Sequence, residues 1–206
     1  MPIGLLGKKI GMTQIFDNSG NVIPITVLQA GPCIVTQIKT YEKHGYEAIQ
    51  IGYIKTRIEK MNKAEAGHLS KSGAPPLKYL CEYKINSPEQ INLGEVITVE
   101  KFQIGQSVNI SGKSIGKGFS GYQKRHNFSR GPMSHGSKNH RQPGSIGAGT
   151  TPGRVFPGKR MAGRMGGEKI TIKNLPIIDI NTEHNLIIVK GTVPGKSGNI
   201  ISIKSQ

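Results

Sequence analysis

Apolar and polar residues alternate in short runs over the first quarter of the chain. Leu5–Phe16 is one such run, and in Val22–Gln29 the apolar side chains recur at every second position from Ile23 to Val27. Alternation with a period of two is typical of a strand with one buried face. The turn-forming residues Asp17–Asn21 lie between the runs, so the pattern predicts a β-hairpin.

Two further strands are predicted at Cys33–Lys39 and Tyr46–Ile54, each after a group of turn-forming residues. Several short strands joined by tight turns favour a small barrel or sandwich over a layered parallel sheet. The residues of the second run that we expect on one buried face are Ile49, Ile51 and Tyr53.

The strand pattern breaks after Arg57. Asn62–Gly73 predicts one short helix, and Tyr79–Ile85 alternates again, which together indicate a side lobe with both helix and strand. Strand character returns at Glu95–Glu100 and Ser107–Ile110. The fold class expected is therefore mainly β, of the α+β kind.

Strand-like runs also follow Glu168. They are residues 169–174, 175–180, 186–191 and 199–204. Strands on both sides of the intervening stretch predict that one barrel is closed by both, which makes that stretch a loop and not a tail. The division expected is a barrel of residues 1–56, 95–112 and 168–206, an inserted α+β lobe of residues 57–94, and a cationic loop of residues 113–167.

Charge separates this loop from the rest of the chain. Lys101–Gly167 contains twelve Lys or Arg residues, three His, fifteen Gly and no Asp or Glu, whereas the other 139 residues carry 16 basic and 12 acidic side chains. A segment with so many like charges and so few apolar side chains to bury cannot pack on itself, so we expect it to bind a polyanion. Nucleic acid is the partner expected, because the spacing of Gly and Pro does not allow the amphipathic helix that binds a membrane surface.

The cysteines and the apolar runs indicate in which compartment the chain is expected. Cys33 and Cys81 have no CxxC partner or ligand-spaced His, so we expect two small hydrophobic residues in a reducing compartment. No run resembles a secretory signal or is long enough to span a bilayer. We therefore expect a soluble, intracellular chain that begins at its own Met1.

Three apparent sites in or near the loop are rejected on chemical grounds. Ser107–Ser114 approaches a phosphate-binding motif but lacks its first glycine. Gly116–Gly121 matches GxGxxG, but Arg141 stands where an acid should hold a ribose, and no helix is expected to follow. Three loop histidines have no carboxylate to orient them, which disfavours metal binding or catalysis. No catalytic residue, metal or cofactor is expected.

RNA contact is the use we expect for the loop's polar residues. Arg outnumbers Lys six to four in the dense part, and guanidinium groups clamp phosphates and stack on exposed bases, which suits folded RNA. Tyr122, Phe128 and Phe156 are available for stacking. The residues expected to contact RNA are Lys117, Lys124, Arg125, His126, Arg130, His135, Lys138, His140, Arg141, Arg154, Lys159, Arg160 and Arg164.

Six segments carry a resemblance to a known family. They are GKKIGMTQIF at residues 7–16, GKGF at 116–119, RGPMSHGSKNHR at 130–141, PGSIG at 143–147, TPGRVFPGKRMAG at 151–163 and NLIIVKGTVPG at 185–195. In this order they resemble the universal large-subunit ribosomal protein L-three family, over essentially the whole chain. The loop is similar to the bacterial form and to its cyanobacterial and plastid branch.

The resemblance implies a Greek-key-like translation-protein β-barrel with an inserted α+β portion and a long extension into ribosomal RNA. It further implies a primary binder near the 3′ end of the large-subunit (23S-type) RNA that nucleates assembly, with neighbouring large-subunit proteins on the barrel. The implied setting is the ribosome of a plastid stroma or a bacterial cytoplasm.

The loop tip is implied to approach the peptidyl transferase centre. On this matching the tip falls at residues 145–152 and includes Ser145, Gly147, Gly149 and Thr150. Some bacterial members carry a methylated glutamine where this chain has Thr150, so that modification is not expected.

Two alternatives remain open at this stage. One is an RNA-processing or RNA-modifying enzyme that captures its substrate with the same loop. The other is a free nucleic-acid chaperone, whose binding would be lost at moderate salt. Neither a membrane nor a small-molecule substrate is expected, and we expect the loop to be ordered by its RNA.

Overall fold

The computed structural model describes residues 4–85 and 91–205. The predicted barrel and lobe segments also include residues 1–3, 86–90 and 206, which lie outside the described residues. The chain divides into two compact units. One contains the residues up to 114 and from 169 onward, and the other, which we call the arm, is Ile115–Glu168.

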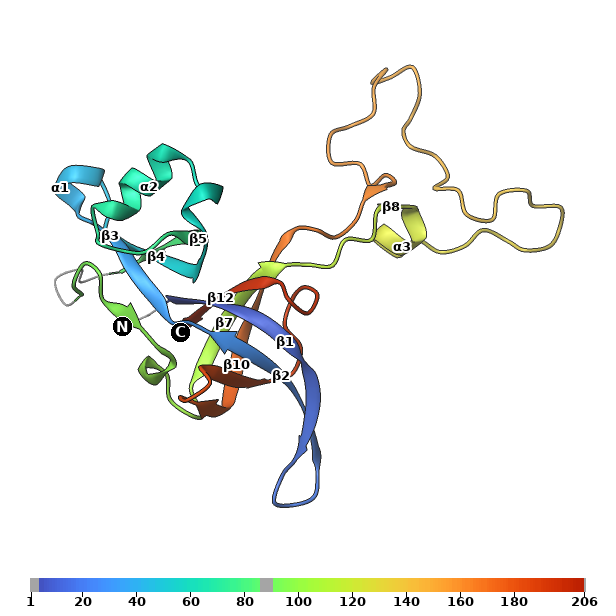
Figure 1. Ribbon diagram of the computed structural model, residues 1–206. Helices are drawn as coiled ribbons and strands as arrows, with labels where there is room; N and C mark the ends of the chain where they lie inside the picture. The colour runs from blue at the N-terminus through green and yellow to red at the C-terminus, as the bar shows by residue number, and fades with distance from the viewer. Residues whose placement is uncertain (1–3, 86–90, 206) are drawn as a thin grey trace. The chain divides into compact units, whose positions relative to one another are not determined.

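Six antiparallel strands form a closed barrel in the first unit (Figure 1). Around the barrel the order is β1 (Gly4–Phe16), β12 (Ile200–Ser205), β7 (Ser107–Lys113), β10 (Lys169–Asn181), β11 (Leu186–Lys190) and β2 (Val22–Ala30). Side chains alternate between buried and partly exposed along β7 and β12, as a barrel wall requires. The predicted mainly β fold is confirmed.

The predicted hairpin is formed by β1 and β2, which pair from Gly7 with Ala30 to Phe16 with Val22. Asp17 closes its turn, donating its amide to Asn21 and accepting from the amide of Gly20, which has a positive φ of 79°. The sequence signal succeeded here because the turn chemistry and the alternation agree.

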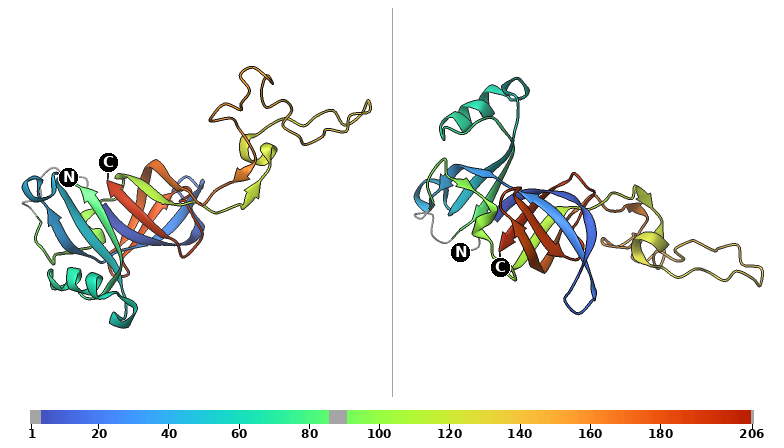
Figure 2. Two further views of the ribbon diagram at one scale, coloured as in Figure 1. Left: turned by 90° about the horizontal axis from the view of Figure 1, so that it is seen from above. Right: turned by 60° about the horizontal axis from the view of Figure 1, so that its bottom comes forward.

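A second, four-stranded sheet forms the lobe, in the order β5 (Leu77–Lys84), β4 (Ala48–Lys55), β3 (Cys33–Lys39) and β6 (Val96–Ile97). Helices α1 (Tyr41–His44) and α2 (Lys63–Ser70) and two short 3-10 helices (Ile58–Lys60 and Val99–Lys101) accompany it. Figure 2 shows this sheet and its helices beside the barrel from two further sides.

The assignment of β3, β4 and β6 to the barrel was therefore wrong. All three lie within segments that were predicted to belong to the barrel, but they pair with β5 and with each other. Alternation predicts that a segment is a strand and which face it buries, and Ile49, Ile51 and Tyr53 are indeed buried. It does not identify the neighbouring strand, because ladder hydrogen bonds are the same for any sequence.

Barrel and lobe share one hydrophobic core. Tyr83 from β5 reaches the barrel, where its hydroxyl donates to the Leu5 carbonyl at 3.3 Å and lies 2.6 Å from the Ser202 hydroxyl. Burial raises the pKa of Tyr83 and raises that of the Cys33 thiol to about 12. Both cysteines are free, with Cys33 buried and Cys81 half-buried, as expected. No helix in the described part of the chain has the length and apolar character to cross a bilayer.

Lys9 fastens β1 to the loop between β11 and β12. Its buried ammonium donates to the carbonyls of Val193 at 2.8 Å and Gly195 at 3.2 Å. The same loop contacts the end of β7, where the Asn199 side-chain amide donates to the Lys113 carbonyl. Lys9 thus stabilises the end of the barrel from which the chain leaves for the arm. Burial lowers the pKa of Lys9.

Replacing Lys9 by Met should lower the free energy of unfolding by about 1–3 kcal/mol, because the two buried carbonyls lose their donor. Denaturant unfolding of the full chain measures this difference. Lys8→Met is the matched control, since Lys8 is exposed, and it should change stability by less than about 0.5 kcal/mol.

The pH dependence gives this prediction a second readout. A lowered pKa means that the unfolded chain binds the Lys9 proton more tightly than the folded chain does. The wild-type chain should therefore gain stability relative to Lys9→Met as pH rises through the alkaline range. An equal loss in both Lys variants, or a constant difference across pH, would contradict this role for Lys9.

Candidate nucleic-acid interface

The base of the arm is a short antiparallel ladder. Strand β8 (Phe119–Ser120) pairs with β9 (Gly163–Arg164). Beside it the Lys117 amide donates to the Met165 carbonyl at 2.9 Å, and the Met165 amide donates to the Gly118 carbonyl at 3.0 Å. The two ends of the arm are therefore held side by side (Figure 1).

A one-turn helix, α3 (Tyr122–His126), follows this ladder directly. The expectation that no helix follows Gly121 was wrong. Gly121 is the N-cap with an extended backbone, and Asn127 ends the helix in the left-handed conformation at a φ of 58°. A helix this short has little stability of its own, so it depends on tertiary contacts that the local glycine content does not reveal.

The Met161 carbonyl supplies the main tertiary contact of α3. It accepts a hydrogen bond from Arg125 Nη1 at 2.7 Å and lies 2.9 Å from His126 Nε2, which donates in the matching tautomer. Gly163 permits this approach, because a Cβ there would lie 2.6 Å from Arg125 Nη1. Arg125 and His126, both predicted to contact RNA, thus hold the arm's own fold together.

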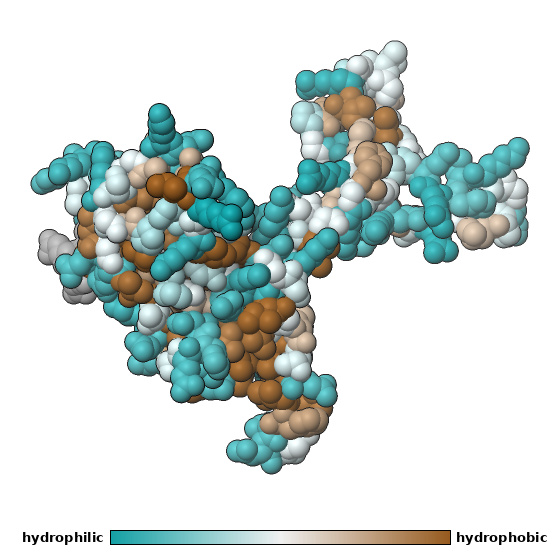
Figure 3. All heavy atoms as spheres, viewed as in Figure 1, coloured by the Kyte–Doolittle hydropathy of each residue, from teal (hydrophilic) through white to brown (hydrophobic). Residues whose placement is uncertain are grey.

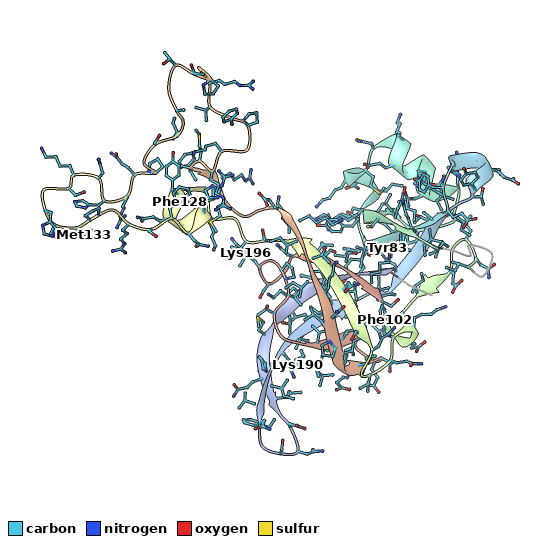
Figure 4. The ribbon with its side chains drawn as sticks, turned by 180° about the vertical axis from the view of Figure 1, so that it is seen from behind. Tyr83, Phe102, Phe128, Met133, Lys190 and Lys196 are labelled. Carbon is cyan, nitrogen blue, oxygen red and sulfur yellow. The ribbon has the colours of Figure 1, made fainter. Side chains whose placement is uncertain are left out.

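Aromatic rings pack on the same helix. The Phe128 ring lies 5.8 Å from that of Tyr122 and 6.1 Å from that of His126, measured between centroids. Figure 4 labels Phe128 beside α3. Tyr122 and Phe128 are half-buried in this cluster, whereas Phe119 is 81% exposed. Phe119 is therefore a free stacking surface that the sequence analysis did not single out.

Beyond α3 the arm divides into two loops, which we call the first loop (residues 127–141) and the second loop (residues 142–160). In the first loop the Gly131 amide donates to the His140 carbonyl, and His140 Nδ1 lies 2.9 Å from the Pro132 carbonyl. The turn at its far end has His135 and Gly136 both at positive φ. Met133 lies near this end in Figure 4.

The second loop contains the predicted tip. The Ser145 hydroxyl donates to the Gly147 carbonyl at 3.0 Å, and the Gly153 amide donates to the Gly149 carbonyl at 3.1 Å. The Arg154 guanidinium lies 5.6 Å from the centre of the Phe156 ring. Every residue from 144 to 160 is exposed.

Most of the predicted RNA contacts are side chains open to solvent. His140 is half-buried like Arg125 and His126, and its ring is bound to the Pro132 carbonyl. The exposed members of the predicted set are Lys117, Lys124, Arg130, His135, Lys138, Arg141, Arg154, Lys159, Arg160 and Arg164. With no carboxylate between Lys101 and Gly167, the lysine and arginine side chains of this set are not neutralised from within that stretch.

The structure shows what two of the motifs rejected in the sequence analysis form instead. Ser107–Lys113 is strand β7, paired on both sides, so the phosphate-binding interpretation of this segment is excluded. His126 and His140 bind separate carbonyls. Among residues 4–85 and 91–205, no three or more His, Cys, Asp or Glu side chains gather as a metal site would require.

Comparison with known proteins adds the family. Residues 82–185 match the sequence model described as Ribosomal protein L3. The chain is 66% identical to "Large ribosomal subunit protein uL3c" of Gracilaria tenuistipitata var. liui, over 98% of this chain and 99% of the relative. It is 61% identical to uL3c of Porphyra purpurea, with the same coverage, and 59% identical to uL3 of Synechococcus elongatus, over 98% of this chain and 95% of the relative.

Arg125→Ala should loosen the base of the arm, because a charged hydrogen bond to the Met161 carbonyl is lost. We expect the amide hydrogens of Lys117 and Met165 to exchange about tenfold faster in the full chain, as the loss of about 1.5 kcal/mol implies. Exchange followed by NMR is the measurement. Arg141→Ala is the control, since Arg141 is exposed, and similar acceleration in both variants would contradict a special role for Arg125.

Proposed function

The chain belongs to the ribosomal protein L3 family, and on this premise we propose that its arm binds the RNA of the large ribosomal subunit while its barrel and lobe form the anchor. It is a structural protein of the large subunit and not an enzyme, which removes the alternative of an RNA-processing activity. Its place is the ribosome of a plastid or a bacterium.

One observation carries the proposal for the arm. Ten exposed cationic or imidazole side chains are distributed over its base and both loops, within a stretch that contains no acid. A single cluster of charge would suit one phosphate, whereas distributed charge suits a ligand with phosphates along its whole length. Arg predominates, which adds bidentate phosphate contact and stacking on unpaired bases.

The predicted set separates into side chains that are hydrogen-bonded within the arm and side chains that are exposed. Arg125, His126 and His140 use main-chain carbonyls of the arm and hold its shape. The exposed members contact RNA. Arg154 and Phe156 form a stacked pair whose ring is 58% exposed, and together they offer a base both a flat apolar face and a nearby positive charge.

We also propose a finer role, which the resemblance to the family supports. The chain acts as a primary binder near the 3′ end of the large-subunit RNA and nucleates assembly, and other large-subunit proteins contact its barrel. The second loop, with Ser145, Gly147, Gly149 and Thr150, approaches the peptidyl transferase region. Support for the last point is the exposure of the whole loop and its lack of bulky side chains near Gly149, where a Cβ would contact nothing.

Replacing Arg130, Arg141 and Arg160 together by Ala should impair large-subunit assembly and leave the barrel folded. Arg125 is kept because it holds the arm itself. A plot of the logarithm of the RNA binding constant against the logarithm of the salt concentration has a negative slope. The magnitude of this slope should decrease by about 2–3, because three phosphate contacts are lost. Filter binding to large-subunit RNA and sedimentation of subunits from cells that express the variant measure the two effects.

A lobe variant with the same change in charge is the control. Lys43, Lys60 and Lys63 are exposed on or beside the lobe helices, and their joint replacement by Ala should leave the salt slope and the sedimentation profile nearly unchanged. Normal subunits from the arm variant, or equal defects in both, would overturn the proposal that the arm is the RNA-binding element.

Thr150→Trp tests the position of the second loop. If the loop lies near the catalytic RNA, a bulky ring there should alter antibiotic sensitivity or the rate of peptidyl transfer while subunits still assemble. Ser70→Trp on the exposed side of α2 should change neither. Ribosomes with Thr150→Trp that match the wild type in both properties would contradict the placement.

A further inference from the structure

The β1–β2 hairpin extends past the strands that flank it. β12 pairs with β1 only at Gly4–Lys8, and β11 pairs with β2 only at Ile25–Gln29. The outer part of β1, Gly11–Phe16, therefore pairs on one side alone, with β2. Figure 1 shows the hairpin projecting from the barrel.

The direction of the main-chain groups on this outer part follows from Pro24. Pro24 has no N–H, and its carbonyl accepts from the Gly191 amide at 2.8 Å, so its polar groups point away from β1. Gln14 lies opposite Pro24 in the register of the two strands. In an antiparallel ladder, when the main-chain groups of one residue point away from the partner strand, those of the residue opposite point away as well. The N–H and C=O of Gln14 therefore point to the free side of β1, and by alternation so do those of Met12 and Phe16.

The two edges of the hairpin differ in their protection. β2 carries Pro24, and the carbonyl of that residue is occupied by Gly191. On β1 the amide and carbonyl of Lys9 are taken by Asn199 and Gly198, but between Gly11 and Phe16 there is neither proline nor charge. Natural proteins usually blunt an exposed edge with one or the other. No strand in the described part of the chain pairs with this segment of β1.

The side chains near this edge are apolar and uncharged. Met12, Phe16 and Val22 are 48%, 67% and 54% exposed. Asp17 is the only charged residue between Ile10 and Ile38, in a chain with a net charge of +16. Figure 3 shows hydrophobic residues continuing from the barrel onto the hairpin. The surface thus lacks the positive charge that phosphate recognition requires. Its apolar side chains and alternating main-chain N–H and C=O groups instead match those of another strand.

We propose that the Gly11–Phe16 edge of β1 receives a β-strand from another protein of the ribosomal particle. The added strand pairs with the outward N–H and C=O groups of Met12, Gln14 and Phe16 and places apolar side chains beside Met12 and Phe16. A second copy of this chain is disfavoured, because two chains of charge +16 repel each other. The proposal rests on membership of the large subunit and not on the RNA contacts of the arm.

Photocrosslinking in assembled large subunits tests this proposal. Phe16→p-benzoylphenylalanine keeps an aromatic ring at the exposed position, and irradiation should join it to one ribosomal protein within one extended segment. In the same background Gln14→Pro removes the outward N–H and should lower the yield about tenfold, whereas Gln14→Ala keeps it and should have little effect. Crosslinks to RNA, to a second copy of this chain or to nothing would overturn the proposal.

A further variant guards against a folding defect in Gln14→Pro. Met12→Lys leaves every main-chain group in place but adds a charge to the edge, so it should also lower the yield. Equal yields in Met12→Lys and in the parent would overturn the proposal, as would a loss in Gln14→Ala as large as that in Gln14→Pro. The amount of each chain in the purified subunits reports separately on RNA binding, so failure of the arm to anchor the protein is distinguished from failure of strand addition.

Discussion

Hydrogen bonds from cations to main-chain carbonyls hold the functional part of this protein together. Arg125 donates to the Met161 carbonyl, and Lys9 donates to the carbonyls of Val193 and Gly195. A carboxylate in any of these places would satisfy the donors but also cancel their charge. A carbonyl accepts the same hydrogen bond and leaves the charge uncancelled. The hydrogen bonds within the arm therefore stabilise its fold and keep the positive potential on which recognition of a polyanion depends.

The parts of the fold that could be predicted are those with a local signal. The alternation and turn of Leu5–Phe16 and Val22–Gln29 predicted the hairpin, and the missing acids marked the arm. The pairing of β3 with β4 and β6 had no such signal, because strand partners are chosen by packing of whole faces. The role of Arg125 was hidden for a related reason, since its acceptor is a carbonyl 36 residues away and any residue at 161 would supply one.

The arm and the β1–β2 hairpin differ in surface chemistry, and each suits one of the two kinds of partner that we propose. The arm contains ten Lys and Arg residues, and the hairpin and the strand that follows it contain one charged residue from Ile10 to Ile38. Uniform coverage with positive charge would attract RNA to every face and leave no face for protein contact. If both proposals hold, this separation lets one small protein join RNA and protein components without competition between them.

Closure of the barrel between β1 and β12 has a consequence for synthesis. β12 pairs with β1 on one side and β7 on the other, and it is translated after the whole arm. A ribosome making this chain therefore releases the cationic arm before the barrel can close, although β7 and β10 on either side of the arm can already pair. From the emergence of Ile115 until Ile200–Ser205 docks, the cationic arm is attached to an incomplete barrel, so a polyanion that binds it in this period binds a chain that has not finished folding.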